Sequence, residues 1–246
     1  MRNCVLLIIS LNFFACNYGL IDKIKNDPLN VTKLDLSRKK LTEIPEYVFE
    51  CKNLETLILF RNQIDSLPPK LGQLKRLRKL VLDENEFRNL DSVLFTLKKL
   101  EFLSLKNNLV TQLPEQIALL TKLKTLQLDY NNLTTLPNTI GELEELEWLT
   151  LNENLLSNLP KEIGNLPKLE FLEIGTNYLE QLPKSMARLE SLILLNLYNS
   201  GQLLFVPDDL CALQNLETVY ADHTQRLPFC WQVERRPRFQ LIINPL

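Results

Sequence analysis

The chain has 246 residues, 45% of them hydrophobic and 24% charged, which is enough apolar material for a sizeable folded core. Its net charge of −2 at pH 7 gives no excess of Lys and Arg to neutralise a phosphate backbone, so we expect no nucleic-acid partner. One His and two Met are little material for acid–base or metal chemistry, and we expect no cofactor and no metal site.

Residues 1–15 predict a signal peptide and therefore export. Arg2 supplies a positive start, and a mostly apolar run extends from Val5 to Ala15. Such a run has the length of the hydrophobic region of a signal peptide and is too short to cross a bilayer as a helix. Cleavage is expected near Ala15 or Gly19. A buried strand of the folded protein is the alternative interpretation of the same run.

The segment that ends at Cys16 leaves two kinds of processing open. Phe13-Phe14-Ala15-Cys16 resembles a relaxed bacterial lipobox, in which Cys16 becomes the lipidated first residue of the mature protein. The chain is then either secreted or held at the outer membrane or cell surface as a lipoprotein, and we expect membrane contact only through this anchor. Residues 16–30 are expected to form a linker and an N-terminal cap, with a short amphipathic turn at 20–30 over the first repeat.

A period of 23 residues dominates the rest of the chain. Val31 lies 23 residues before the first of a series of evenly spaced leucines, and Leu216 lies 24 residues after the last, so one residue is inserted near Gly201-Gln202. Residues 31–228 therefore form eight repeats and the start of a ninth. The leucines that are spaced by 23 are Leu54, Leu77, Leu100, Leu123, Leu146, Leu169 and Leu192.

Each repeat follows the pattern L-x-x-L-x-L-x-x-N-x-L-x-x-L-P-x-x-I-G-x-L-x-x, which is the leucine-rich-repeat signature. The L-x-L alternation predicts a short strand with one buried face, and stacked repeats predict a parallel sheet. The Leu-Pro step indicates an extended return, which leaves room only for short 3₁₀ or helical turns. We therefore predict an α/β repeat solenoid, an arc or horseshoe with a concave parallel sheet and these turns on its convex side.

One asparagine in most repeats is expected to stabilise the turn that follows the strand, because its amide both donates to and accepts from inward backbone groups. Lys39 and Ser200 replace it in the first and eighth repeats, at the two ends of the series. In the third repeat, Leu90-Asp91 replaces Leu-Pro. The asparagines are Asn62, Asn85, Asn108, Asn131, Asn154 and Asn177.

Side chains that alternate with the core leucines point to the concave face, and many of them are aromatic. Trp148 and Phe171 lie one repeat apart, which is about 5 Å along the sheet. Exposed aromatic clusters with a polar rim mark partner surfaces. The alternatives are ordinary single exposed aromatics, or a groove closed by self-association or by the C-terminal tail. The predicted partner-binding residues are Phe60, Phe102, Tyr130, Trp148, Phe171, Tyr178, Tyr198 and Tyr220.

Three cysteines lie in the repeats or after them. Cys51 occupies a core leucine position, so we expect a buried free thiol. For Cys211 and Cys230, a disulfide and two thiols packed in the terminal core are both compatible with the sequence. Residues 229–246 are expected to form the C-terminal cap, with Arg235, Arg236 and Arg238 facing water. Its apolar cover is predicted from Cys230, Trp231, Val233, Phe239, Leu241, Ile242 and Ile243.

The stretch from Asn26 to Pro45, the L-P-x-x-I-G-x-L repeats and Cys16 resemble the 23-residue leucine-rich-repeat lipoproteins that spirochaetes of the Leptospira type export. This resemblance implies an arc, secretion or surface display, and contact with proteins, host proteins included. The repeat specifies the fold and not the partner.

No catalytic motif accompanies the repeats. His223 next to Asp222 makes no triad, and the acidic cluster of Asp83, Glu84 and Glu86 is interpreted as a solvated face. We therefore expect no catalytic residues and a non-enzymatic protein-binding module, exported or surface-displayed. The alternative is a scaffold within the cell envelope that binds a bacterial partner.

Overall fold

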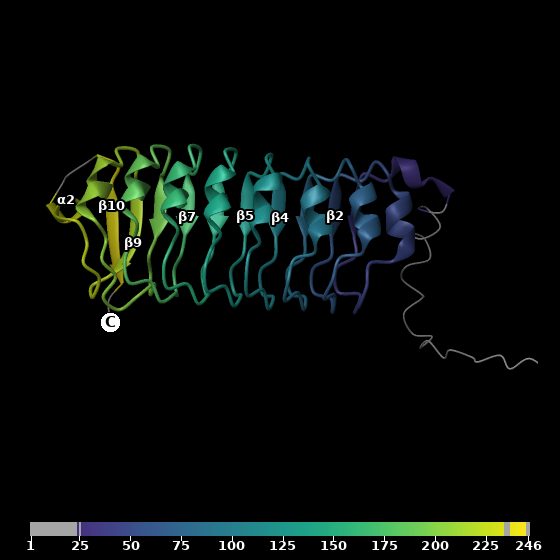
Figure 1. Ribbon diagram of the computed structural model, residues 1–246, viewed down its shortest axis with the longest axis horizontal. Coiled ribbons are helices and arrows are strands. Elements are labelled where there is room, and N and C mark those ends of the chain that lie inside the picture. The colour runs from purple at the N-terminus through teal and green to yellow at the C-terminus, as the bar shows by residue number, and fades with distance from the viewer. Residues whose placement is uncertain (1–23, 25, 234–236, 245–246) are drawn as a thin grey trace, which may run out of the picture.

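The computed structural model describes residue 24, residues 26–233 and residues 237–244. The predicted signal peptide, Cys16 and most of the predicted N-terminal cap lie outside these residues. Within them, one sheet contains ten parallel strands that follow one another in sequence order. Figure 1 shows the strands side by side along the long axis, and each strand from β1 to β9 is followed by a helical turn. The predicted repeat solenoid is confirmed.

Each strand from β1 to β9 starts two residues after the leucine, or Val31, that opens its repeat. From β1 to β8, partners in neighbouring strands are 23 residues apart, as in Leu103 and Leu126, because the first seven repeats have the same length. The spacing is 24 between β8 and β9 and 22 between β9 and β10. The strands are β1 (Lys33–Asp35), β2 (Thr56–Ile58), β3 (Lys79–Val81), β4 (Phe102–Ser104), β5 (Thr125–Gln127), β6 (Trp148–Thr150), β7 (Phe171–Glu173), β8 (Leu194–Asn196), β9 (Thr218–Asp222) and β10 (Gln240–Asn244).

The return segments form the predicted 3₁₀ turns. Pro137 is typical of the residue before such a turn, with an extended backbone at φ −69° and ψ 152°. Asp91 keeps this geometry at φ −67° and ψ 143°, and its carboxylate accepts a hydrogen bond from the Leu67 amide at 2.7 Å. The turns are η2 (Pro28–Asn30), η3 (Glu46–Glu50), η4 (Pro69–Gln73), η5 (Ser92–Thr96), η6 (Glu115–Leu119), η7 (Asn138–Glu142), η8 (Lys161–Asn165), η9 (Lys184–Arg188) and η10 (Asp208–Ala212).

The turns pack so closely that glycine is required in two of them. A Cβ atom on Gly141 would lie 2.3 Å from the Glu162 carbonyl oxygen, and one on Gly164 would lie 2.1 Å from the Ser185 carbonyl oxygen. The Ile-Gly step of the repeat therefore sets how near one convex turn approaches the next.

The asparagines form the predicted ladder inside the strand-to-turn bend. The Asn131 amide nitrogen donates to the carbonyl oxygens of Leu105 at 2.8 Å and Leu128 at 3.1 Å. Its carbonyl oxygen accepts from the Val110 amide at 2.9 Å. The other five asparagines repeat this pattern, and each side chain thus joins two adjacent repeats.

The ladder continues beyond the last asparagine, Asn177, into the eighth and ninth repeats. Ser200 is buried and donates to the Leu197 carbonyl oxygen at 2.6 Å. In the ninth repeat, the Gln225 amide nitrogen donates to the same oxygen at 2.7 Å. Gln225 stands one residue after the asparagine position, and its longer side chain reaches the same acceptor.

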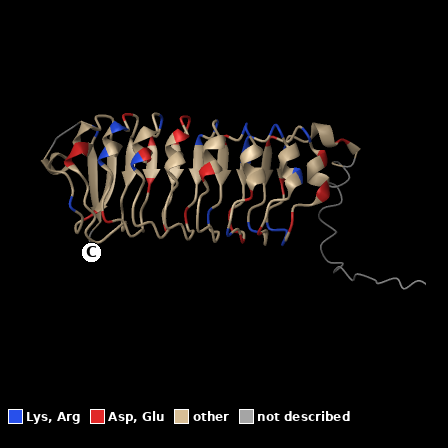
Figure 2. Ribbon diagram, in the orientation of Figure 1, with Lys and Arg blue, Asp and Glu red and all other residues tan. Residues whose placement is uncertain are grey.

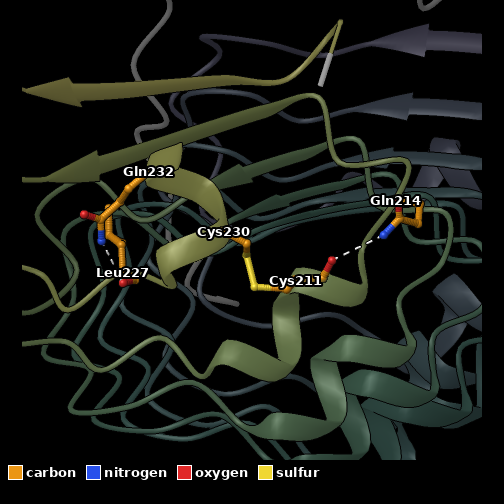
Figure 3. The surroundings of a disulfide bond; sticks show 5 residues. All are labelled: Cys211, Gln214, Leu227, Cys230 and Gln232. Atoms are coloured by element: carbon orange, nitrogen blue, oxygen red, sulfur yellow. Dashed lines mark hydrogen bonds between the residues drawn. A yellow bond between two sulfur atoms is a disulfide. The ribbon is translucent and has the colours of Figure 1, made fainter. Parts of the chain in front are cut away.

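A disulfide joins the last 3₁₀ turn to the C-terminal segment. Cys211 of η10 is bonded to Cys230 of α2 (Phe229–Val233), as Figure 3 shows, so of the two states that the sequence left open the structure contains the disulfide. Cys51 is a buried free thiol, as predicted. At the other end of the sheet, Ile24 is buried within the same core.

The C-terminal cap differs from the prediction, because it adds a tenth strand. Trp231 is buried and Phe239 and Leu241 pack against the core, but the prediction that Val233, Ile242 and Ile243 cover it is wrong. Their exposed fractions are 55%, 40% and 39%, respectively. The two isoleucines lie on β10, outside which no further strand follows among the described residues. Arg238 is exposed as expected, whereas Arg235 and Arg236 lie outside the described residues.

Candidate functional site

A stacked pair of aromatic rings lies at the centre of the sheet's concave face. Trp148 opens β6 and Phe171 opens β7, and the two residues are paired in register. Their ring centroids are 4.8 Å apart and the planes are inclined by 30°. Trp148 is 40% exposed and Phe171 is half-buried, so both rings lie at the surface of the protein and outside the core.

Two tyrosines extend this surface toward the C-terminal end. Tyr198 and Tyr220 line a hollow of about 420 Å³ together with Glu173, Leu194 and Asn196. The Tyr198 hydroxyl oxygen accepts a hydrogen bond from the side chain of Asn244 on β10 at 2.7 Å. Leu194 follows Phe171 in the same file of paired residues, so the apolar surface is continuous from β6 to β8.

Tyr178 belongs to a neighbouring hollow beside the bends. This hollow measures about 620 Å³ and is lined in part by Tyr178, Leu155 and Leu203, of which Tyr178 is 66% exposed. The sequence did not single out the two leucines, because Leu155 stands at the tenth, variable position of its repeat and Leu203 follows the irregular insertion. Because this hollow lies beside the bends, Tyr178 flanks the concave face and does not lie at its centre.

Tyr130 is exposed on a backbone that side chains rarely adopt. Its φ is +57°, in the left-handed region, and the eighth residue of every repeat from the first to the eighth shares this conformation. A bulky aromatic is unfavourable in this conformation, and the Tyr130 side chain is 53% exposed, so it does not fill the core. The residues concerned are Arg38, Arg61, Glu84, Asn107, Tyr130, Glu153, Thr176 and Asn199.

The two N-terminal aromatics have a different environment. Arg38 lies over the Phe60 ring at 5.5 Å, and Lys79 lies over the Phe102 ring at 4.2 Å. Both rings are half-buried. The eight predicted residues thus do not form one cluster: the structure groups Trp148 with Phe171 and Tyr198 with Tyr220, and it places cations on Phe60 and Phe102.

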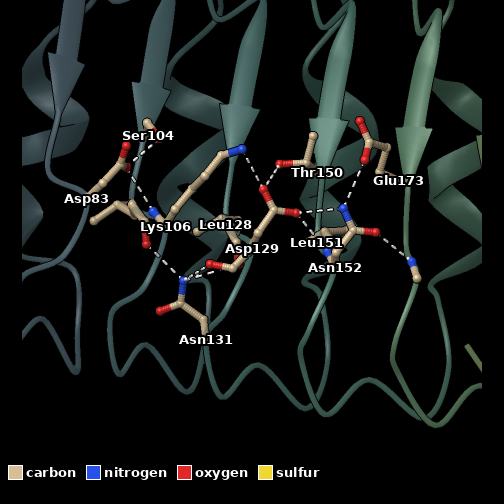
Figure 4. A network of polar contacts seen from close by, with 12 residues as sticks. Asp83, Ser104, Lys106, Leu128, Asp129, Asn131, Thr150, Leu151, Asn152 and Glu173 are labelled. Atoms are coloured by element: carbon tan, nitrogen blue, oxygen red, sulfur yellow. Dashed lines mark hydrogen bonds and ion pairs between the residues drawn. The ribbon is translucent and has the colours of Figure 1, made fainter. Parts of the chain in front are cut away.

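A buried polar network supports the concave face next to the aromatic pair (Figure 4). Asp129 is 3% exposed and accepts hydrogen bonds from the Thr150 hydroxyl and, at 2.9 Å each, from the backbone and side-chain nitrogens of Asn152. Lys106 neutralises it with an ion pair of 2.9 Å. Asn152 also donates to Glu173 at 3.0 Å. The network therefore fixes residues at the ends of four strands, β4 to β7, beside the rings.

Asp83 begins this network one repeat earlier. Its carboxylate accepts hydrogen bonds from the Ser104 hydroxyl and from the Lys106 amide. Burial raises the pKa of Asp83 above its ordinary value, although both hydrogen bonds and the Lys106 charge oppose that shift. Sequence reasoning took Asp83 for a solvated residue and did not single out Asp129; polar residues at four successive seventh positions were the available signal.

Charges of both signs are interleaved along the whole stack (Figure 2). At the second repeat position, directly before the strands, Arg78 pairs with Glu101, and Lys124 pairs with Glu147 at 3.2 Å. Among the described residues, no group of three His, Cys, Asp or Glu side chains is arranged to hold a metal ion. No helix in the described part of the chain is long and apolar enough to cross a membrane. His223 is exposed and lines another hollow together with Tyr198 and Asn244.

The family model for leucine rich repeats matches residues 30–87, 75–133 and 121–179, together more than half of the chain. No curated protein matches the chain significantly in sequence. Among solved structures, a leucine-rich-repeat protein of Leptospira interrogans is 27% identical with a TM-score of 0.66, over 92% of this chain and 71% of that one.

Two further structures have the same fold. Internalin C2 of Listeria monocytogenes is 27% identical with a TM-score of 0.70, over 79% of this chain and 82% of that one. The leucine-rich-repeat ectodomain of an Arabidopsis thaliana receptor kinase, in complex with Casparian strip integrity factor 2, is 28% identical with a TM-score of 0.70. That similarity covers 85% of this chain and 26% of the receptor chain, so this chain spans about a quarter of the receptor.

Proposed function

Because this chain belongs to the leucine-rich repeat family, we propose that it is an exported, non-enzymatic module that binds a protein partner through the concave face of its sheet. The family resemblance inferred from the sequence is confirmed, and the fold is a protein-interaction module. The exposed stack of Trp148 on Phe171 carries the proposal, because neither ring is needed to fill the core. The receptor ectodomain in complex with its factor shows a related fold in a binding role.

The chemistry of the face favours a protein surface as partner. Large aromatic side chains bury much area at low entropic cost and dominate binding energy at protein interfaces. The rim around the pair is polar, with Glu173 and Asn152 already held in place by hydrogen bonds. A preorganised rim reduces the ordering cost of binding. The proposed contact residues are those predicted from the sequence, with Trp148, Phe171, Tyr198 and Tyr220 at the centre.

The proposal of export rests on the N-terminal sequence and the disulfide. Residues 1–15 have the pattern of a signal peptide, and Cys16 stands at the end of the lipobox-like segment. The bond between Cys211 and Cys230 fits an oxidising compartment. We propose secretion, or display on the outer membrane or cell surface through a lipid at Cys16. A cell-envelope scaffold for a bacterial partner is the second candidate, and cleavage by protease added to intact cells distinguishes display from it.

Replacement of both stacked rings tests the binding face. The double variant Trp148→Ala/Phe171→Ala is expected to keep the unfolding midpoint and far-ultraviolet circular dichroism of the wild type. Loss of about 2 kcal/mol for each ring weakens affinity at least a hundredfold. The measurement is capture of host-cell surface proteins by the immobilised chain, followed by titration of each captured protein.

Leu119→Ala is the matched control for this experiment. Leu119 is an equally exposed apolar residue, 47% accessible, but it lies on the convex turn η6. The control is expected to capture the same proteins as the wild type. A captured protein that binds the double variant with unchanged affinity would show that the partner uses another surface.

A further inference from the structure

The C-terminal edge of the sheet is formed by a strand without protection. β10 pairs with β9 along one side, and no strand pairs with its other side within the described part of the chain. It has five residues, whereas β1 to β8 have three each. An uncharged, apolar edge of this kind presents unpaired backbone amides and carbonyls, with which a strand of another chain can form hydrogen bonds.

The opposite edge is protected in the usual way. β1 is short, and its exposed residues Lys33 and Asp35 are charged on either side of the buried Leu34. Charged side chains on an edge strand prevent a second strand from approaching. β10 has the sequence Gln-Leu-Ile-Ile-Asn and carries no charge at all. Among the described residues, the two edges of the sheet therefore differ, and the C-terminal edge is the one suited to pairing.

Both faces of β10 expose apolar groups that pairing would cover. Leu241 and Ile243 are in register with Val219 and Ala221, whose side chains are fully buried, and so they continue the core file at its open end. Ile242 is in register with Tyr220 and continues the concave surface. Ile243 remains 39% exposed although Ala221, its neighbour in the core file, is fully buried, and Ile242 at 40% is as exposed as Tyr220 at 37%.

The order of polar and apolar residues on β10 makes this strand complementary to a second copy of itself in antiparallel orientation. The strand is polar at both ends, Gln240 and Asn244, and apolar at its three central residues. Antiparallel pairing about Ile242 places Leu241 opposite Ile243 of the second copy and Gln240 opposite Asn244 of the second copy. Apolar groups then meet apolar groups, and amides meet amides, on each face. A two-fold axis requires such self-complementarity.

We propose that this protein forms a homodimer by antiparallel pairing of β10 with β10 of a second copy. The two-fold axis passes through the sheet at Ile242, so both sheets join into one that continues across the dimer. The concave faces then open to the same side, and the Tyr198–Tyr220 hollows of the two copies lie near the junction. The dimer therefore contains two copies of the proposed binding face, and the Trp148–Phe171 pair of each copy lies outside the dimer interface.

The oligomeric state of the full chain tests this pairing. Light scattering after size exclusion is expected to give twice the chain mass of 28.7 kDa for the wild type at about 100 μM. Ile242→Lys places two like charges opposite each other and is expected to give the monomer mass. Leu119→Lys adds the same charge on a convex turn and is expected to remain dimeric. Circular dichroism verifies that both variants fold.

Cysteine cross-linking tests the register, in a parent chain that carries Cys4→Ser and Cys16→Ser. Directly opposed residues of an antiparallel pair have Cα atoms 4.5–5.5 Å apart, within reach of a disulfide. Ile242→Cys is therefore expected to form a covalent dimer on mild oxidation. Gln240→Cys is the control: the two copies of this residue lie about 13 Å apart along the strands and are expected to stay uncrosslinked.

Three results would overturn the proposal: a monomeric wild type, a dimeric Ile242→Lys variant, or equal cross-linking of the Ile242→Cys and Gln240→Cys variants. Equal cross-linking indicates a different register or contact by collision.

Discussion

Single polar side chains determine whether adjacent repeats join, and Asn131 shows this most clearly. Its amide donates to carbonyl oxygens of two repeats and accepts from a third group, all within the buried bend. In Asn131→Asp the carboxylate cannot donate, so the Leu105 and Leu128 carbonyls each keep only the donor from a neighbouring asparagine, and a charge is buried next to them. We expect the free energy of unfolding to fall by roughly 3 kcal/mol.

Urea unfolding followed by circular dichroism measures this loss. Asn89→Asp is the control, since Asn89 is exposed and the same change there should leave the midpoint where it is. Equal midpoints for Asn131→Asp and the wild type would mean that the ladder contributes nothing to stability.

At the residue scale, the sequence predicted the distances between side chains better than it predicted their burial. The period alone placed Trp148 and Phe171 about 5 Å apart along the sheet, and their rings are 4.8 Å apart. The burial of Asp129 was not predictable in the same way, because a polar residue at an alternating strand position is normally solvated. Its burial depends on Lys106 and Asn152, which come from the two neighbouring repeats.

At the scale of elements, the strands and turns follow from the repeat, but the C-terminal cap does not. Each of the first eight strands has neighbours whose identical pattern determines its register. After Pro228 the period ends, so nothing in the local sequence indicated that Gln240–Asn244 would add a strand instead of folding over the core. Its apolar run is equally compatible with a buried cover, which is what we predicted.

The disulfide is the element that fastens this cap. Cys211 and Cys230 are 19 residues apart in sequence and link η10 to α2. A loop of this length limits the unfolded chain, and its loss costs about 3 kcal/mol in the chain-entropy model. We expect Cys211→Ser/Cys230→Ser to lower the unfolding midpoint and to open the cap to limited proteolysis, while the central repeats stay protected.

Reductant provides the control for the disulfide. Dithiothreitol should lower the midpoint of the wild type to that of the double variant and leave the double variant unchanged. A wild type that is indifferent to reductant would contradict a stabilising role of the bond.

At the scale of the whole molecule, the chain is a one-dimensional stack. Each strand pairs only with the strands before and after it, so stability is the sum of repeat and interface contributions. The effect of a destabilising substitution on the stack must then depend on its position along the stack as much as on the side chain that is lost. Leu34 and Leu126 allow a matched comparison, because they occupy the same repeat position, in β1 and β5, and are both buried.

We expect Leu34→Ala and Leu126→Ala to differ in how far their effects extend. Each loses the same side chain, a change that costs 2–5 kcal/mol in a well-packed core. At the end of the stack the loss can be confined to the first repeats, whereas in β5 it weakens two interfaces and separates the halves. Amide hydrogen exchange at low urea should therefore accelerate only near β1 and β2 in Leu34→Ala, and on both sides of β5 in Leu126→Ala. Uniform acceleration over all repeats in both variants would instead show that the stack unfolds as one cooperative unit, and that its repeats are coupled more strongly than contact between neighbours provides.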